Sequence, residues 1–357
     1  MRFALSTEQL DFAAELHKIL DAGQVPAAVR AWAAGDPTKG RVLLRQVSDM
    51  GVFGLLVDEQ YGGAEATPVD LVVALTELGR AGLPGPVIES TAVIPALLQR
   101  LPNAEPAQRW LPALAGGDLL GTVTFDEPQH SIALDTDTAE FVLVAGGDRV
   151  SLGRRGRLHA PADGADSSAD PEAVALDAAL PITSIDPPRK LARVVRAEVV
   201  AEGAQVRAAI DYAFDVGVLA CAAQLSGAGR AILEQTVAYA KQRKQFGRAI
   251  GEFQAVKQQL ADVRIALDLA EPLLYRAALT LDSEDRARDV SAALVACGAA
   301  AHRAARAGLQ VHGAIGYTAE FDLSLWLTKV AALRTAWGTA DFHRARIGSA
   351  LRVTAAV

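Results

Sequence analysis

A cluster of cations surrounds a phenylalanine and a glycine at the end of a predicted long helix. It reads Arg243-Lys244-Gln245-Phe246-Gly247-Arg248 and is followed by Gln254. Arginine presents a planar fork of donors that matches a diphosphate, and the adjacent phenylalanine can pack on a ring. A helix C-terminus also attracts cations for electrostatic reasons, so on spacing alone a solvated basic helix end is the simpler interpretation. The more specific interpretation is a phosphate clamp.

A second stretch, Gln310-Val311-His312-Gly313-Ala314-Ile315-Gly316-Tyr317, carries two glycines three residues apart. Such glycines end a helix and turn the chain. They also let a ligand approach the backbone closely, because no side chain stands in the way. Taken alone, the pattern is typical of a helix end followed by a turn.

Residues for other kinds of catalysis are not grouped in the sequence. The six histidines are scattered, and none pairs with a cysteine or carboxylate at metal-ligand spacing. Neither a Gly-x-Ser-x-Gly elbow nor a P-loop occurs. We therefore expect no metal centre.

Composition limits the class of protein. The chain has 357 residues, 51% apolar and 22% charged, which is a globular composition with room for two or three domains. Its 35 basic and 42 acidic residues give a net charge of −7, which disfavours nucleic-acid binding. Cys221 and Cys297 lie in apolar helical contexts, so a reducing compartment is expected. With no apolar run of ~18 residues and no signal peptide, we expect a cytoplasmic protein without a membrane segment.

Three segments with different patterns must position these residues. Residues 1–118 predict an N-terminal helical domain, which opens on a capping-box spacing at Ser6 to Gln9. Residues 119–203 predict a small β domain from short β-forming runs, with a loop rich in Ala, Asp, Ser and Pro over 160–186. Residues 204–357 carry apolar stripes that predict long antiparallel helices in a C-terminal bundle. The expected fold class is mainly α with a small β domain.

Together, the two bundle motifs resemble those of the acyl-CoA dehydrogenase family of flavoproteins. The matches are to R-K-x-F-G at 243–247, to the glutamine seven residues later at Gln254, and to Q-x-x-G-G-x-G-Y/F at 310–317, where Ala314 replaces the second glycine. Residues 57–63 look like the family's V-P-E-x-Y-G-G turn, and residues 77–80 look like its E-x-G-R helix end. The resemblance covers essentially the whole chain.

The resemblance implies a fold, a cofactor and a reaction. The fold is an N-terminal helical domain, a middle β domain, shortened here, and a C-terminal four-helix bundle. The cofactor is FAD, and the reaction is α,β-dehydrogenation of an acyl-CoA thioester. A carboxylate removes the α-proton while the β-hydrogen leaves as hydride to flavin N5. An electron-transfer flavoprotein is the expected electron acceptor.

The catalytic base of the family is missing at both of its usual positions. The usual glutamate directly precedes a Gly-Thr pair, and here Trp337 occupies that place before Gly338 and Thr339. An indole offers only an N–H donor and cannot act as a base. Other members place the base on the first long bundle helix, at or near Gly217 in this chain. Asp215 and Asp341 are the nearest carboxylates and remain weak candidates for a relocated base.

The β domain also departs from the family pattern. The T-E-P-x-x-G-S-D stretch reads Phe125-Asp126-Glu127-Pro128-Gln129-His130-Ser131-Ile132, and no W-I-T strand is found. Asp126 replaces the flavin-facing threonine, and an ionised carboxylate there cannot donate a hydrogen bond. Thr339 is the one clear remnant of the elements that bind a subunit's own flavin.

The motifs that this chain keeps are those that, in the family, reach across a dimer interface to the ADP part of a neighbour's FAD. We therefore expect the glutamate-lacking subunit of a heteromeric, α2β2 acyl-CoA dehydrogenase, similar to those of actinobacterial steroid side-chain degradation. A sister subunit would carry the catalytic glutamate, and the substrate would be a bulky acyl-CoA. The residues expected at the FAD are Arg243, Phe246, Gln254, Gln310, Gly313 and Thr339, and no catalytic residue is expected in this chain.

Three alternatives use the same residues. A self-sufficient dehydrogenase would bind one FAD per chain and turn over acyl-CoA with a relocated base. A flavin monooxygenase of the same fold needs no carboxylate base but does need a flavin-ring pocket. A non-enzymatic scaffold subunit would bind no FAD, although assembly alone does not require a diphosphate clamp.

Overall fold

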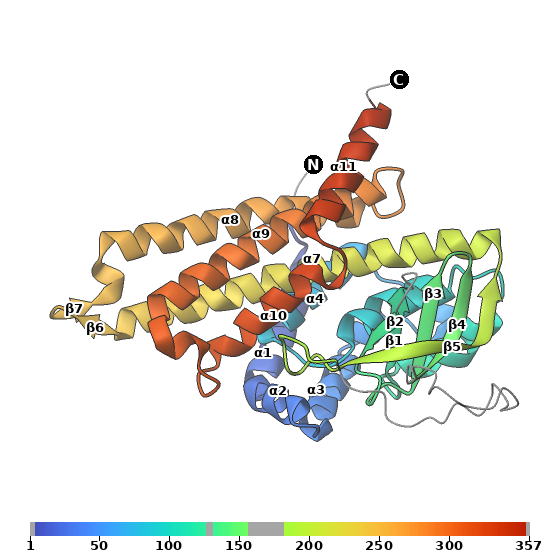
Figure 1. The fold of residues 1–357 in the computed structure, drawn as a ribbon, viewed down its shortest axis with the longest axis horizontal. Coiled ribbons are helices and arrows are strands. Elements are labelled where there is room, and N and C mark those ends of the chain that lie inside the picture. The colour runs from blue at the N-terminus through green and yellow to red at the C-terminus, as the bar shows by residue number, and fades with distance from the viewer. Residues whose placement is uncertain (1–3, 126–130, 156–181, 355–357) are drawn as a thin grey trace, which may run out of the picture.

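The computed structural model describes residues 4–125, 131–155 and 182–354. The N-terminal helices and a small sheet lie along one side of a long helical bundle (Figure 1). This arrangement confirms the expected fold class, which is mainly α with a small β domain. Residues 126–130 and most of the 160–186 loop lie outside the described residues.

The first N-terminal helix begins at a side-chain capping box. Before α1 (Thr7–Ala22), the Ser6 hydroxyl accepts a hydrogen bond from the Gln9 backbone N–H at 3.2 Å, and the Gln9 side chain accepts one from Ser6 N–H at 3.0 Å. This capping box was predicted. The other helical elements of this part are α2 (Val25–Ala33), α3 (Thr38–Asp49), η1 (Val52–Gly54), η2 (Glu59–Tyr61), α4 (Pro68–Ala81), the π-helical turn η3 (Glu89–Val93), α5 (Ile94–Leu98) and α6 (Glu105–Ala115).

The five-stranded sheet has the order β1-β3-β4-β5-β2. The strands are β1 (Gly121–Phe125), β2 (Ser131–Leu134), β3 (Phe141–Gly146), β4 (Arg149–Arg155) and β5 (Leu191–Glu202). β1 pairs in parallel with β3, and the other pairs are antiparallel. β2 pairs with β5, so a contact between distant parts of the chain forms this edge of the sheet.

The bundle is built on α7 (Ala204–Gln242), which runs through the middle of the molecule (Figure 1). By length and composition α7 could cross a membrane, but 89% of its most apolar window is buried inside the protein, as in a core helix. Its partners are α8 (Gln254–Leu279), α9 (Arg286–His312), α10 (Leu323–Ala336) and α11 (Ala340–Thr354). The connections hold a hairpin of β6 (Lys244–Gln245) and β7 (Arg248–Ala249), η5 (Ile250–Glu252) and η6 (Gly313–Tyr317).

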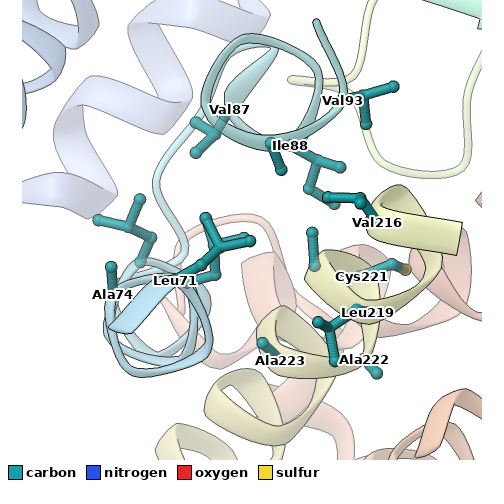
Figure 2. Packing of buried hydrophobic residues seen from close by; sticks show 14 of the residues in the cluster. Leu71, Ala74, Val87, Ile88, Val93, Val216, Leu219, Cys221, Ala222 and Ala223 are labelled. Carbon is teal, nitrogen blue, oxygen red and sulfur yellow. The ribbon is translucent and has the colours of Figure 1, made fainter. Parts of the chain in front are cut away.

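Glycines let α4 cross α7 at close range. A Cβ added to Gly79 would lie 2.3 Å from Gln224 O, and one added to Gly227 would lie 1.9 Å from Thr76 O. Side chains from both parts then share one core, where Leu71 and Ile88 face Leu219 of α7 (Figure 2). The N-terminal helices and the bundle are therefore held as one packed unit.

Candidate functional site

Both bundle motifs start from helix ends that touch. Tyr239, near the end of α7, stacks on His312, the last residue of α9, with ring centroids 4.2 Å apart. His312 is held further by a 2.8 Å hydrogen bond between its Nδ1 and Gly308 O. The β6–β7 hairpin lies at the end of the bundle that is far from the sheet (Figure 1). The stacked rings therefore tie the two predicted phosphate-binding segments to one end of the molecule.

The first motif forms an exposed hairpin of β6 (Lys244–Gln245) and β7 (Arg248–Ala249). Its turn is Phe246-Gly247, with φ of +52° and +79°, a backbone region that a phenylalanine rarely adopts. Phe246 is 91% exposed. The Arg243 guanidinium is exposed and makes no hydrogen bond or ion pair within the described part of the chain. The ring and the guanidinium are both available to a ligand or a partner.

The second motif keeps an open glycine turn. Gly313 has φ +66° and ψ −145°, which only glycine adopts readily, and no atom lies within 4 Å of where its Cβ would be. Ala314 is not among the positive-φ residues, so alanine fits there. Gln254 and Gln310 are exposed, and their side chains have no hydrogen-bonding partner among the described residues.

A cleft of about 720 Å³ lies between the sheet, α7 and the turn from α10 to α11. Thr339 lines it, and its hydroxyl accepts a hydrogen bond from Phe342 N–H at 3.2 Å, so that it caps α11. By the helical rise of ~1.5 Å per residue, Gly217 beside this cleft and Arg243 lie roughly 40 Å apart along α7. Thr339 is thus separated from the other five residues that the sequence predicted at the FAD.

Trp337, which follows α10, packs against α7 at Gly217, the second expected base position. A Cβ added to Gly217 would stand 2.3 Å from Cζ3 of the indole, so the ring occupies the space of that missing side chain. The rings of Phe125 and Phe214 also pack against the indole, with ring centroids 5.7 and 6.2 Å from that of Trp337. The two positions at which the motifs predict a base are therefore in contact, and neither residue is a carboxylate.

We expect Gly217→Ala to destabilise the protein by about 1–3 kcal/mol, because the methyl group overlaps an indole that its neighbours hold in place. The check is a shift of the urea unfolding midpoint. Gly298→Ala on α9 is the matched control, since its Cβ would meet nothing closer than 3.8 Å. It should be neutral or slightly stabilising. Equal stabilities of the two variants would contradict the contact.

The two carboxylates considered as a relocated base have other roles. Asp215 is buried and forms ion pairs with Arg286 at 2.9 Å and Arg346 at 2.6 Å. Asp341 is 92% exposed and pairs with Arg344 at 2.9 Å. Neither belongs to the described residues that line the cleft. Asp215 is a structural anchor between α7, α9 and α11, and Asp341 lies at the surface.

A buried histidine fixes the turn that carries Trp337. His343 Nε2 lies 2.8 Å from Trp337 O, and Nδ1 lies 3.0 Å from Ser291 Oγ. A carbonyl only accepts, so Nε2 carries the proton and donates it. Burial lowers the pKa of His343, which keeps the ring neutral. This arrangement holds the indole in the cleft.

Sequence reasoning missed a set of charged side chains beside the cleft. We call Glu89, Asp135, Asp186, Arg189 and Lys329 the charged junction. Four of them are buried and Arg189 is partly buried. They come from η3, the β2–β3 connection, the segment before β5, and α10. One sequence feature could have identified two of these residues, since Glu89 and Lys329 are charged residues within apolar runs.

Asp135 makes the stability of this junction depend on pH. Trp32 Nε1–H donates to Oδ1 at 3.1 Å, while Oδ2 is buried without a partner among the described residues. Burial raises the pKa of Asp135 to about 7. Between pH ~4 and ~7 the folded state holds a proton that the unfolded chain has lost, so stability falls as pH rises.

Asp135→Asn keeps the acceptor for Trp32 and removes the titration. The free energy of unfolding of the variant, measured relative to that of the wild type, should therefore increase from pH 5 to pH 8 by on the order of 2 kcal/mol. Urea unfolding at the two pH values measures this. The exposed Asp11→Asn is the control and should follow the wild-type profile. Parallel profiles for Asp135→Asn and the wild type would refute the prediction.

Two further sequence expectations concern Asp126 and metal binding. Asp126 and the following Glu127-Pro128 lie outside the described residues. Within the parts of the chain that are described, no group of three or more His, Cys, Asp or Glu side chains could hold a metal ion. Cys221 and Cys297 are both buried and unpaired.

Family comparisons agree with the architecture. Residues 6–118 match the model of the acyl-CoA dehydrogenase N-terminal domain, and residues 207–352 match that of the acyl-CoA dehydrogenase C-terminal domain. The class defined in this way is that of FAD-dependent oxidoreductases that act on CH–CH bonds. The chain belongs to the acyl-CoA dehydrogenase family, which confirms the recognition made from the motifs.

Individual relatives support the same family. The chain is 30% identical over 305 residues to the acyl-CoA dehydrogenase IpdE2 from Mycobacterium tuberculosis, with 85% of each chain covered. The ChsE4-ChsE5 complex from Mycobacterium tuberculosis superposes with a TM-score of 0.80 and 23% identity, covering 99% of both chains. Butyryl-CoA dehydrogenase from Megasphaera elsdenii superposes with a TM-score of 0.79 and 19% identity, covering 98% of this chain and all of that one. Both structures share the fold.

Proposed function

We propose that this chain is the glutamate-lacking subunit of a heteromeric, FAD-dependent acyl-CoA dehydrogenase, assembled as α2β2 with a sister subunit that carries the catalytic glutamate. The observation that carries the proposal is the contact between Trp337 and Gly217, which leaves no carboxylate at either base position. FAD supplies the hydride acceptor when it is bound. This chain would contribute binding groups for it and no base.

The far end of the bundle fits the diphosphate of FAD. Arg243 supplies a forked cation, Gln254 and Gln310 supply amide donors, and the open turn at Gly313 leaves room for close approach. Phe246 offers an exposed ring for packing. These residues lie roughly 40 Å along α7 from their own cleft, which supports contact with the FAD of a neighbouring subunit.

An apolar stripe on α8 supports assembly with another subunit. Ile265, Leu269, Leu273 and Leu279 are exposed by 55, 70, 40 and 58%. Rows of exposed large apolar side chains are typical of protein–protein interfaces. In the proposed complex the substrate is a bulky acyl-CoA, such as a steroid side-chain thioester, and the electron acceptor is an electron-transfer flavoprotein. The complex would be cytoplasmic.

The names of two related proteins support a partner and a substrate class. One similar structure is a complex of two differently named chains, ChsE4 and ChsE5. The relative IpdE2 is named as an acyl-CoA dehydrogenase and comes from the same actinobacterium. These names fit a two-chain acyl-CoA dehydrogenase, and they leave the acyl group to be identified by assay.

The test compares the chain purified alone with the chain co-expressed with a glutamate-bearing sister subunit. Alone, it should be nearly colourless and inactive with acyl-CoA. In the complex, we expect about one FAD for every two chains, together with turnover. A yellow, active homo-oligomer with one FAD per chain would overturn the proposal. Glu89 would then be the base to examine, because it is the one carboxylate among the described residues that line the cleft.

A further inference from the structure

One side of the bundle is built from two helices that carry cations and almost no acidic residues. α9 has no Asp or Glu after Asp289, and α10 has none along its length. His302, Arg303 and Arg306 of α9 are exposed, and Arg334 of α10 is partly exposed. We call these four residues the basic face. The chain as a whole has a net charge of −7, so a face of cations alone departs from its average composition.

The side chains of the basic face lie close enough to affect one another. α9 and α10 pack side by side (Figure 1), and a Cβ added to Gly298 of α9 would lie 3.8 Å from Cγ of Arg334. His302 follows Gly298 by one helical turn, and Arg306 follows His302 by one more. Partial desolvation, and after it the Arg334 and Arg306 guanidinium groups, lower the pKa of His302.

The arginines of the basic face are not paired within this chain. Among the described residues, Arg303, Arg306 and Arg334 have no hydrogen-bond or ion-pair partner. Most surface arginines of the bundle differ, as Arg230 and Arg264 do, which pair with acidic residues of α8. The three guanidinium groups are therefore available to carboxylates or phosphates from another molecule.

The basic face lies between two sites that the proposed function assigns to this chain. Arg306 lies one helical turn before Gln310, one of the predicted FAD contacts, so both share the exposed side of α9. At the other end, Arg334 directly precedes Thr335, which lines the cleft together with Ala336. A sister subunit whose FAD reaches Gln310 therefore lies against the basic face or directly beside it.

Exposed apolar side chains at the end of the basic face favour a protein over a free anion. Leu309, Ile315 and Tyr317 are 37, 44 and 67% exposed. Leu309 lies on α9 between Arg306 and Gln310, and the other two lie on η6, which directly follows α9. Protein interfaces combine aromatic and apolar residues with arginine, whereas a free phosphate gains nothing from an apolar surface.

We propose that the basic face docks an acidic surface of the sister subunit, so that charge selects this partner over a second copy of the same chain. The inference rests on the proposed function, because the sister subunit is the occupant. Carboxylates of the sister pair with Arg306 and Arg334 through charge-assisted hydrogen bonds. A second copy of this chain, facing it across a two-fold axis, would bring the same cations, and such like-charge contacts disfavour a homodimer.

The first test measures the dissociation constant of the co-expressed complex by mass photometry on dilution, at low and high salt. At low salt, Arg306→Glu should weaken the complex by at least about tenfold, because an attraction becomes a repulsion. High salt should narrow this difference, since salt screens charges at an interface rim. Arg306→Lys keeps the charge and should stay within about threefold of the wild type.

The matched control is Arg207→Glu, which makes the same change of charge near the other end of α7. It should leave the dissociation constant within about threefold of the wild type. Equal affinities of Arg306→Glu and Arg207→Glu at low salt would overturn the proposal. A complex of unchanged affinity that loses FAD with Arg306→Glu would also overturn it, because the face would then hold a phosphate group.

A second test identifies the occupant of the face. Arg306→Lys and Arg334→Lys each introduce an amine, which a water-soluble carbodiimide joins to an ion-paired carboxylate as an amide, with loss of water. Peptide mass spectrometry should find links from positions 306 and 334 to Asp or Glu of the sister subunit. Links to a second copy of this chain instead would overturn the proposal.

The proposed function and this inference fail in different ways. An active complex whose affinity does not respond to Arg306→Glu or to salt would refute only the role of the basic face. Failure to form any complex with a glutamate-bearing sister subunit would refute the proposed function, and the docking of that subunit with it.

Discussion

Replacing Arg243 by methionine in the assembled complex is expected to weaken FAD binding by about a hundredfold, because two charge-assisted hydrogen bonds to a diphosphate are lost. The guanidinium makes no hydrogen bond or ion pair with another side chain in the described part of its own subunit. The substitution should therefore leave the thermal stability of the FAD-free chain unchanged. The measurement is the recovery of free FAD fluorescence on dilution.

The matched control is Arg207→Met, which removes an exposed cation from the opposite end of the same helix. It should keep FAD at the wild-type affinity. If Arg243→Met and Arg207→Met released FAD equally, the bundle end would have no role in cofactor binding. A large loss of FAD with Arg243→Met alone would support contact across the subunit interface, since Arg243 lies far from its own cleft.

Removing the catalytic carboxylate of the proposed sister subunit should greatly reduce turnover. A general base contributes roughly 10²–10⁴ in rate, so a glutamate-to-glutamine change in the sister subunit should lower kcat by at least a hundredfold. Asp341→Asn in this chain should leave kcat within about twofold, because Asp341 is exposed and paired with Arg344 outside the cleft. Stopped-flow bleaching of the flavin under anaerobic conditions measures both.

Asp215 needs a different measurement because it anchors two arginines. Asp215→Asn leaves Arg286 and Arg346 without their ion pairs, so a loss of activity could reflect misfolding. The informative quantity is the rate of flavin bleaching per folded complex with bound FAD. An unchanged rate fits a structural role. A loss of more than a hundredfold in folded, yellow complex would identify Asp215 as the base and contradict the proposal.

Local rules in the sequence were enough to predict much of the fold. The capping box at Ser6 depends on residues three positions apart, and the bundle helices depend on apolar stripes along one segment. The β domain was predicted as a segment, but strand β2 could not be placed within it, because its four residues are stabilised by β5, about 60 residues further along the chain. Short strands depend on their partners more than on their own composition.

The site was harder to predict because it is built from distant segments. The motifs predict that Trp337 stands where the family has its base, but its contact with Gly217 depends on how α7 packs against the α10–α11 turn. The charged junction brings together residues from across the chain, and no spacing rule links Glu89 to Arg189. Only the packed structure shows that these two face the same cleft.

The contact between Trp337 and Gly217 also limits how this chain can change. A glutamate at position 217 would collide with the indole, and a glutamate at position 337 would leave a void where the ring now packs. Each substitution alone is expected to lower the free energy of unfolding by a few kcal/mol, whether or not the new carboxylate can act as a base. Any side chain at position 217 would therefore require a smaller residue at position 337, so each of these two positions limits which substitutions the other can accept.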